Sequence, residues 1–471
     1  MNTTKLAIIG GGPGGYVAAF KAADLGLDVT LIDEEVNPGG VCLYRGCIPS
    51  KALLHIAKLL NESREAEKWG VKFAEPEIDL DRLREWKNEV ITKMTGGLGQ
   101  LVKARKLKHI QGRARFVDAH TLHIDKADGD QDQLQFENAI LATGSRPAVP
   151  GVFRLATDRI MDSTGALELN DIPASMLVVG GGIIGMELGQ AYAALGTKVS
   201  VVEMLPGLIP PADRDLVKPL QNKVAERFEE VMLNTQVTQL EEGPDGLTVH
   251  LQDLDGKKSA KTYDKILLSV GRVPNSGDIG LETTAIAVDE RNYVQVDGQM
   301  RTAEPSVFAI GDLVGAGLAH TASHQGAMVS EVIAGHDKLV FEPNAIPSVV
   351  YTDPEIAWCG LTEEEAKKIG RRIKVARFPW AASGRATTQD TNDGVTKLLI
   401  DPETDRVLGV GIAGSGAGEL IAEGVLAIEM AALASDIQLS IHPHPTLSET
   451  VMEAAEVHYG QSPHLYAPKR S

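Results

Sequence analysis

A long internal repeat constrains the fold of this 471-residue chain more than any other feature. The stretch LAIIGGGPGGYVAAFKAADLGLDVTLID at 6–33 returns as MLVVGGGIIGMELGQAYAALGTKVSVVE at 176–203, with an offset of 170 residues (176 minus 6) and no gap. Each copy passes from an apolar strand through a glycine-rich turn into a helical pattern, and closes with a second apolar strand and an acid. This order is typical of a βαβ unit that binds a dinucleotide. We therefore expect an α/β fold with two Rossmann-like domains.

Both copies carry the spacing G-x-G-x-x-G. The first glycine allows a tight turn, the second lets the backbone approach a pyrophosphate, and the third lets helix and strand pack closely. Asp33 and Glu203 each lie 18 residues beyond the third glycine, where a carboxylate can bind a ribose hydroxyl. One motif would mean little among 48 glycines, whereas two complete copies predict two bound dinucleotides. The six glycines are Gly10, Gly12 and Gly15, then Gly180, Gly182 and Gly185.

The acid of the second copy indicates which nucleotide binds there. A carboxylate at Glu203 would repel the 2'-phosphate of NADP, and Met204, Leu205 and Pro206 provide no arginine to receive that phosphate. The second site therefore favours NAD. The first site leaves FAD and NAD both open on these residues alone.

Two of the three cysteines, Cys42 and Cys47, lie five positions apart in GGVCLYRGCIPSK at 39–51. Three cysteines cannot form a disulfide framework, and a zinc site needs about four ligands, which no second cysteine pair or histidine cluster supplies. Cys359 is isolated and far along the chain. A metal pair, an inert pair and a redox couple all stay open, and we favour the redox couple. We expect no metal site.

Composition excludes several classes of protein. A formal charge of -18 and a pI near 5.2 argue against a nucleic-acid-binding face, which is normally basic. The length predicts three or four domains, and no apolar run reaches the ~18 residues of a membrane span. MNTTKLAIIGGG passes straight into a strand pattern without the features of a secretory leader, so we expect a cytoplasmic protein.

Four features together resemble one known family. They are the doubled fingerprint, the cysteine stretch, AIGD at 309–312 and HPHPTLSE at 442–449. In this order, from Leu6 to about Ser462, they resemble the dihydrolipoyl dehydrogenases of the class I pyridine nucleotide-disulfide reductase family. The resemblance covers nearly the whole chain. It implies two Rossmann-like domains, for FAD and NAD, followed by an α+β dimerisation domain.

The resemblance also implies a cofactor and residue set. FAD would occupy the first site, against a redox disulfide formed by Cys42 and Cys47, and Lys51 would lie beside the flavin, paired with Glu187. NAD would occupy the second site. Besides Gly10, Gly12, Gly15, Asp33 and Lys51, the FAD site would contain Gly40, Val41, Ala114, Thr143, Gly144, Ser145, Asp312 and Ala319. Besides Gly180, Gly182, Gly185 and Glu203, the NAD site would contain Ile183, Val237, Gly271 and Arg272.

The histidine motif supplies a base, because a thiolate and not a thiol attacks a disulfide. His444 would take the proton and Glu449 would orient its ring, while His442 is the weaker alternative. The resemblance implies a cis bond from His444 to Pro445, and a base that reaches the disulfide of the partner subunit in a homodimer. The apolar helical pattern at 418–435 fits either that interface or an intrachain core.

The implied activity is oxidation of protein-bound dihydrolipoamide, with electrons passing through the cysteine pair and FAD to NAD+. The partner would be the lipoylated acyltransferase of a 2-oxoacid dehydrogenase complex or the lipoylated protein of glycine cleavage, since we expect no lipoyl domain fused at the amino terminus of this chain. The alternatives are a glutathione-type reductase, which Glu203 disfavours, and a non-enzymatic binding module that keeps the fold. A mercuric reductase would need a further cysteine pair near the C-terminus.

Two stretches depart from the family pattern. Most members have asparagine and valine where this chain has Tyr44 and Arg45. Arg45 could stabilise a nearby thiolate, or it could face solvent or pair with an acid. LAHTASHQG at 318–326 replaces a more acidic run. The predicted domains are 1–149 (FAD), 150–275 (NAD), 276–346 (return to the FAD domain) and 347–471 (interface).

Overall fold

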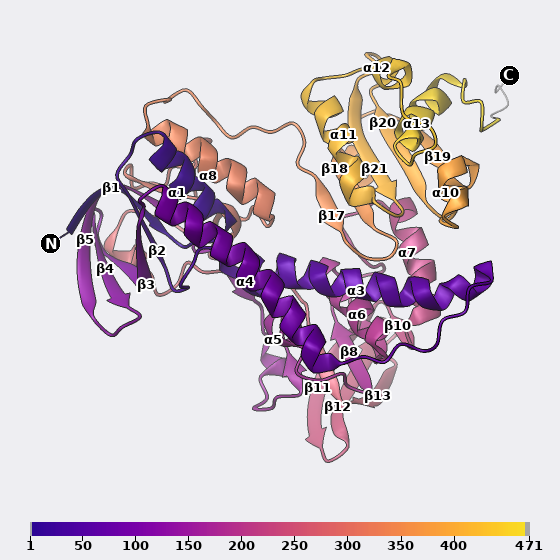
Figure 1. The fold of residues 1–471 in the computed structure, drawn as a ribbon, viewed down its shortest axis with the longest axis horizontal. Coiled ribbons are helices and arrows are strands. Elements are labelled where there is room, and N and C mark those ends of the chain that lie inside the picture. Colours follow the sequence, from indigo (N-terminus) through magenta and orange to yellow (C-terminus); the bar gives the residue numbers. More distant parts are fainter. Residues whose placement is uncertain (1, 467–471) are drawn as a thin grey trace.

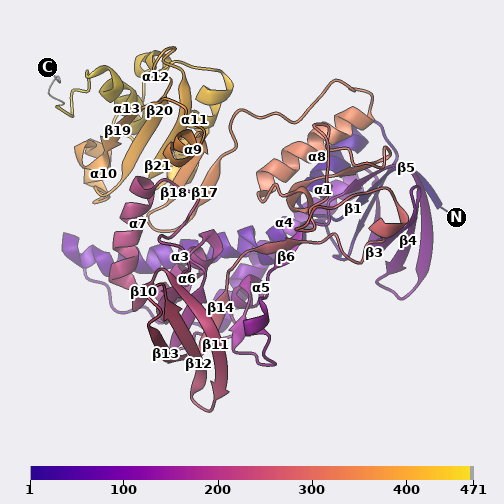
Figure 2. The same cartoon turned by 180° about the vertical axis from the view of Figure 1, so that it is seen from behind.

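Three large sheets, each with its own helices, make up the computed structural model, which describes residues 2–466. In Figure 1 the first sheet lies at the left, the second at the bottom and the third at the upper right, and Figure 2 shows the same arrangement from behind. This architecture confirms the predicted fold class. The domain boundaries stay a prediction, and residues 467–471 of the predicted interface domain lie outside the described residues.

The first sheet has a parallel part in the order β3-β2-β1-β5-β16. Strands β3 and β5 continue beyond it and pair with β4 in an antiparallel meander. Helices α1 and α8, which are distant in sequence, pack against each other beside this sheet (Figure 1). The elements are β1 (Asn2–Ile9), α1 (Pro13–Asp24), β2 (Val29–Asp33), α2 (Gly40–Arg45), α3 (Cys47–Glu65), α4 (Leu80–Ala104), β3 (Lys108–Asp118), β4 (Thr121–Lys126), β5 (Gln131–Leu141), β16 (Val307–Ala309) and α8 (Ala319–Ile333).

The second sheet is parallel, in the order β10-β9-β8-β14-β7, and repeats the plan of the first. An antiparallel meander, β11-β12-β13, again accompanies it. The elements are β7 (Ile160–Met161), α5 (Ser163–Glu168), β8 (Ser175–Val179), α6 (Ile183–Leu195), β9 (Lys198–Val202), α7 (Arg214–Arg227), β10 (Glu230–Met232), β11 (Thr235–Gly243), β12 (Gly246–Asp253), β13 (Lys258–Tyr263) and β14 (Lys265–Leu268).

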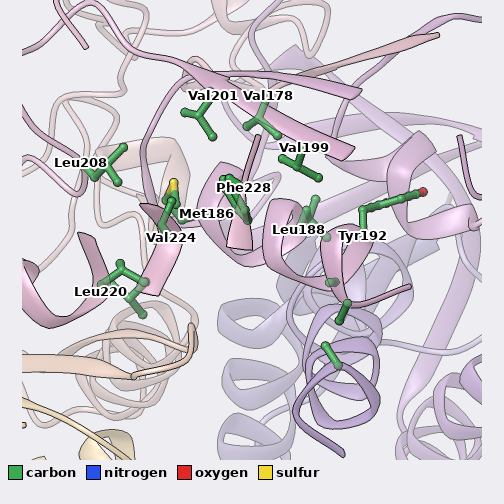
Figure 3. Close-up of a cluster of buried hydrophobic side chains, with 14 of the residues drawn as sticks. Val178, Met186, Leu188, Tyr192, Val199, Val201, Leu208, Leu220, Val224 and Phe228 are labelled. Carbon is green, nitrogen blue, oxygen red and sulfur yellow. The ribbon is translucent and has the colours of Figure 1, made fainter. Parts of the chain in front are cut away.

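Helix α6 is anchored by a large apolar core. Met186, Leu188 and Tyr192 of this helix pack with valines of β8 and β9 and with residues of α7, as Figure 3 shows. The Tyr192 hydroxyl donates to the Ala166 carbonyl at 2.7 Å, so the polar tip of this buried ring is satisfied. The helix is thereby fixed on its sheet, and α3 packs along it.

Two short strands connect the first two units. β6 (Ser145–Pro147) and β15 (Arg272–Pro274) pair antiparallel, so the chain leaving the first sheet lies beside the chain returning to it. We call β6 and β15 the crossing strands, and the stretches 142–147 and 270–275 that contain them the crossing segments.

The third sheet is antiparallel, in the order β17-β18-β21-β20-β19, and α7 of the second unit contacts it. Helix α11 covers β18 and β21, and α13 covers β19 and β20. Within residues 2–466, no helix is both long enough and apolar enough to cross a membrane. The elements are β17 (Ser348–Val350), β18 (Ile356–Gly360), α9 (Glu363–Lys368), β19 (Lys374–Pro379), α10 (Gly384–Thr388), β20 (Val395–Ile400), β21 (Val407–Ala413), α11 (Ala417–Glu429), α12 (Ala434–Leu439) and α13 (Glu449–Tyr459).

Candidate active site

The two fingerprint turns have nearly the same geometry. The first glycines, Gly10 and Gly180, have φ of 105° and 103°, a region that favours glycine. A Cβ on Gly15 would lie 1.8 Å from the Gly10 carbonyl oxygen, and one on Gly185 would lie 2.2 Å from that of Gly180. The third glycine is therefore required for the helix to pack on the turn.

Both fingerprint helices begin with free backbone donors. Helix α1 follows Gly12 and α6 follows Gly182 at Ile183, and no side chain caps either helix or places an acid in its first turn. A Cβ on Gly182 would meet open space. Free N–H groups at a helix N-terminus suit a pyrophosphate, so both turns fit the two dinucleotides.

The acids that end the repeats fold back onto these turns. The Asp33 carboxylate accepts hydrogen bonds from the backbone N–H groups of Gly11 and Glu35. Glu203 accepts the equivalent bonds from Gly181 at 2.7 Å and Leu205 at 2.8 Å. Each carboxylate oxygen keeps a second lone pair for a ribose hydroxyl.

The cysteines lie on either side of a break between two helices. Cys42 is in α2, and Cys47 is the first residue of α3, after Gly46. The hydrogen bond from the Cys42 thiol lowers the pKa of Cys47 to about 7 against the effect of burial, and the Lys51 charge adds to this lowering. The same hydrogen bond and burial raise the pKa of Cys42. Cys47 is therefore the more acidic thiol of the pair, and Cys42 the less acidic one.

Lys51 lies one turn after Cys47 on α3 and forms an ion pair with Glu187 of α6, with Nζ to Oε2 at 2.8 Å. Glu187 is buried, and its carboxylate also accepts hydrogen bonds from the Ser50 hydroxyl at 3.1 Å and the Tyr351 backbone N–H at 3.0 Å. The structure thus brings together a pair that lies 136 residues apart in sequence. Neither Ser50 nor Tyr351 was identified from the sequence, because both act through contacts that no motif records.

Asp312 lies against the crossing strands. Its carboxylate accepts a hydrogen bond from the Ser145 hydroxyl, and its Oδ2 lies 3.7 Å from Arg272 Nε. Arg272 also donates to the Ser145 hydroxyl at 2.7 Å and to the Ser145 carbonyl at 2.6 Å. The structure therefore places Arg272, expected at the NAD site, beside two residues expected at the FAD site.

Asn275 joins the crossing segments and was missed by the sequence analysis. Its side chain donates to the Thr143 carbonyl at 2.9 Å, and its backbone N–H donates to the Gly144 carbonyl at 2.9 Å. The Thr143 hydroxyl donates back to the Asn275 carbonyl at 2.9 Å. The sequence GRVPN shows an asparagine after proline but nothing that identifies its partner.

The other expected site residues lie as follows. Gly40, with φ of 55°, begins α2 and packs on the Gly12 turn, and Val41 follows it, exposed. Ala319 begins α8, and Gly271 immediately precedes β15. Ala114 is buried in β3, and Val237 lies at an irregularity in β11.

The histidine motif forms a hydrogen-bonded pair on the third unit. His444 Nδ1 lies 2.9 Å from Glu449 Oε1, and the His444 side chain is 76% exposed. Burial raises the pKa of Glu449, but hydrogen bonds from the Thr446 N–H and the His444 ring hold that pKa below its ordinary value. The His442 side chain is only 7% exposed and lies 2.8 Å from Glu423, which leaves His444 as the available base. The expected cis bond from His444 to Pro445 is present.

Arg45 pairs with an acid. Its guanidinium forms an ion pair with Glu35, in the segment after β2. Of the alternatives left open for Arg45, this is pairing with an acid. The Tyr44 hydroxyl donates to the Asn37 carbonyl at 2.9 Å, so both departures from the family pattern are bound to the segment after β2.

Comparison with known proteins agrees with this arrangement. The profile of the pyridine nucleotide-disulphide oxidoreductase family matches residues 4–326, and that of the dimerisation domain of this family matches residues 346–455. Among solved structures, LpdA from Mycobacterium tuberculosis has a TM-score of 0.88 at 26% identity, over 96% of this chain and 99% of its own. The flavoprotein disulfide reductase RclA from Escherichia coli has a TM-score of 0.86 at 27% identity, over 97% and 99%.

Curated relatives extend the match. The dihydrolipoyl dehydrogenase of Haemophilus influenzae is 48% identical, over 97% of this chain and 95% of its own. That of Vibrio cholerae is 47% identical over 97% and 96%, and that of Geobacillus stearothermophilus is 43% identical over 98% and 97%. The chain therefore belongs to the pyridine nucleotide-disulphide oxidoreductase family, within its dihydrolipoyl dehydrogenases.

Proposed function

We propose that the chain oxidises protein-bound dihydrolipoamide and reduces NAD+, with FAD and a Cys42–Cys47 disulfide as the electron relay. One observation carries the proposal. Cys47 begins α3, its pKa is lowered to about 7, and the Lys51–Glu187 pair follows one turn later on the same helix face. A low-pKa thiol beside a fixed cation is the arrangement that thiol–disulfide exchange requires.

The exchange begins at the base. His444 is bound to Glu449 through Nδ1, so Nε2 is the atom that accepts the first substrate thiol proton. The resulting substrate thiolate attacks the Cys42 sulfur, which forms a mixed disulfide and releases Cys47 as a thiolate. The second substrate sulfur then closes the lipoyl ring and releases Cys42, which takes up the second proton. Two electrons have then passed from the substrate to the cysteine pair.

The residue environments suit these roles. The raised pKa of Cys42 suits the sulfur that exchanges and is reprotonated. The lowered pKa of Cys47 suits the sulfur that stays ionised beside Lys51. FAD, when bound at the first fingerprint, supplies two-electron chemistry that links the dithiol to NAD at the second.

The proposed enzyme is a homodimer. Among the described residues, His444 makes no hydrogen bond to Cys42 or Cys47, and its exposed ring is available to another subunit. The match to the dimerisation domain supports a base supplied by the partner subunit. Leu426 on α11 and Met430 directly after this helix are exposed, while the opposite face of α11 packs on its own sheet, and both residues suit this interface.

The proposed macromolecular partner is a lipoylated protein: the acyltransferase of a 2-oxoacid dehydrogenase complex or the carrier of glycine cleavage. The acidic charge of -18 suits a basic docking segment on that partner. We place the reaction in the cytoplasm, because the cysteine pair must cycle between thiol and disulfide forms.

Turnover with two nucleotides tests the proposal. The protein is purified under air, its visible spectrum is recorded, and dihydrolipoamide oxidation is measured with NAD+ and with NADP+. The proposal predicts a flavin spectrum and turnover that strongly prefers NAD+. A flavin spectrum with glutathione disulfide reduction by NADPH, and no dihydrolipoamide oxidation, would instead identify a glutathione-type reductase.

A further inference from the structure

Tyr351 of the third unit contacts both members of the Lys51–Glu187 pair. Its backbone N–H donates to Glu187 Oε1 at 3.0 Å, while Lys51 uses Oε2 of the same carboxylate. The Lys51 Nζ lies 4.6 Å from the centroid of the Tyr351 ring. This distance is within the range of a cation–π interaction. Tyr351, the residue that follows β17, therefore limits the position of the Lys51 side chain on the side of the third unit.

The segment that carries Tyr351 is fixed on α6. Gln190, three residues after Glu187, accepts from the Asp353 backbone N–H at 2.7 Å and donates to its carbonyl at 3.1 Å. The Asp353 carboxylate lies 2.7 Å from Arg227 of α7. Glu187 and Gln190, at positions i and i+3 of α6, thus bind the two ends of the stretch 351–353. The ring is therefore presented to Lys51 from a rigid support.

The ring, and not the hydroxyl, makes the contact with Lys51. Within residues 2–466, the Tyr351 hydroxyl forms no hydrogen bond to another described residue, and the residue is 39% exposed. The Lys51 side chain is 33% exposed and flexible, so it has room to turn towards solvent if nothing limits it. A negative ring face on one side and a carboxylate on the other limit that freedom.

We propose that Tyr351 is a positioning residue whose ring holds the Lys51 ammonium towards the Cys42–Cys47 pair and so keeps the Cys47 thiolate stabilised. This inference rests on the proposed role of Cys47 in the exchange. It gives the third unit a second role, in the ionisation of Cys47, in addition to supplying the base His444.

Other charged groups around the contact are few and mostly acidic. Lys51 faces Glu187 from α6 and both cysteines from its own side. Tyr351 faces Glu355 and Glu419 in addition to that pair, and Glu355 faces Lys58. A leucine at 351 leaves all these charges in place, so it changes only the ring.

The test compares two substitutions in the flavin-loaded protein. Both Tyr351→Phe and Tyr351→Leu keep the backbone N–H to Glu187, but only phenylalanine keeps a ring face. Each protein is reduced with one equivalent of dithionite under nitrogen, and the long-wavelength absorbance of the thiolate beside the flavin is titrated with pH. We expect the midpoint to rise by about half a pKa unit or more in the leucine variant and to stay unchanged in the phenylalanine variant.

Two further sets of variants make the test independent of folding defects. Phenylalanines with increasing fluorination at 351 weaken the ring face at constant shape, and the midpoint should rise stepwise with fluorine number. In a Lys51→Met background, Tyr351→Leu should produce no additional shift.

Three results would overturn the role of Tyr351. They are an unchanged midpoint in Tyr351→Leu, equal shifts in the phenylalanine and leucine variants, or a full further shift without Lys51. The titration uses neither lipoamide nor NAD. Failed turnover of the unmodified protein would therefore count against the proposed function alone.

Discussion

Lys51 Nζ lies 2.8 Å from Glu187 Oε2, and this contact joins the helix that begins at Cys47 to α6, the helix of the second fingerprint. The ammonium lowers the pKa of Cys47, whereas the carboxylate raises it. The pair therefore adjusts the ionisation of the thiol through two opposite charges, in addition to the larger effect of the Cys42 hydrogen bond. Its effect can be measured on the thiol itself.

Lys51→Met should raise the pKa of Cys47 above its value of about 7, because the nearest cation is removed. The thiolate forms as pH rises through this pKa, so the long-wavelength absorbance of the reduced protein at pH 7 should fall. A shift of about one unit corresponds to roughly tenfold less thiolate well below the pKa. Lys58→Met is the matched control on the same helix, since Lys58 is 48% exposed and lies 3.8 Å from Glu62. Equal shifts in both variants would contradict a specific role for Lys51.

His444→Gln should reduce dihydrolipoamide oxidation by about 10²- to 10⁴-fold, the usual contribution of a general base. NADH oxidation with ferricyanide as acceptor should be preserved, because that reaction needs no proton transfer from a substrate thiol. His336→Gln is the matched control, since His336 is exposed and lies 3.4 Å from Glu331. If His444→Gln lowers both activities equally, its role is structural.

Glu203→Ala should weaken NAD+ use and improve NADP+ use, because it removes the carboxylate that disfavours a 2'-phosphate. Adding Met204→Arg, at a position that is 66% exposed, should improve NADP+ use further. For the double variant we expect the ratio of kcat/KM for NAD+ to that for NADP+ to fall by ~10-fold or more. The control is Asp33→Asn, at the equivalent position of the first repeat. It should reduce flavin retention and leave the nucleotide ratio unchanged, and a changed ratio there would contradict the assignment of the two sites.

Lys397→Met should destabilise the contact between α7 and the third sheet. The Lys397 side chain is 1% exposed, and its Nζ lies 2.6 Å from Asp213, 2.7 Å from Asp215 and 2.8 Å from Glu363. Removal of the cation leaves the buried Asp213 carboxylate without an ion-pair partner among the described residues, and Asp215 and Glu363 with Arg377 alone. We expect a cost of about 3–5 kcal/mol in the free energy of unfolding. Denaturant titration measures this loss. Arg377→Met removes a 43% exposed side chain that pairs with Asp215 and Glu363 of the same cluster, and it should cost about 1 kcal/mol or less.

The stability supplied by this cluster should depend on acid pH. Burial raises the pKa of Asp215, but Lys397 and Arg377 lower it below its ordinary value overall. A carboxyl group whose pKa is lower in the folded state than in the unfolded state stabilises the fold at pH values above its unfolded pKa of about 4. This stability is lost as the pH falls through the folded pKa. The difference in unfolding free energy between the unmodified protein and Lys397→Met should therefore shrink below about pH 4. A difference that is constant from pH 7 to pH 3 would contradict this account.

The repeat predicted the two nucleotide folds because their turns depend on local spacing. Gly10 and Gly180 have φ within two degrees of each other, and both final acids bind the middle residue of their turn. The histidine motif likewise predicted the hydrogen-bonded pair of His444 and Glu449. Such features need only a few neighbouring residues and basic stereochemistry.

Long-range contacts could not be predicted in the same way. Tyr351 meets Glu187 across 164 residues, and Lys397 meets Asp215 across 182. An isolated lysine in an apolar strand such as VTKLLI gives no indication that three acids of other elements will surround it. Arg45 shows the same limit, since its choice between a thiolate and Glu35 depends on where the segment after β2 lies.

The most direct test of the central claim is the redox state of the individual cysteines. The protein purified under air is mixed with one equivalent of dihydrolipoamide under nitrogen, quenched in denaturant with an alkylating reagent, and mapped by mass spectrometry. We expect Cys42 and Cys47 to be unlabelled before the addition and labelled after it. The buried thiol of Cys359 is the internal control and should be labelled in both samples. Cys42 and Cys47 labelled equally before and after the addition would contradict a disulfide relay between lipoamide and flavin.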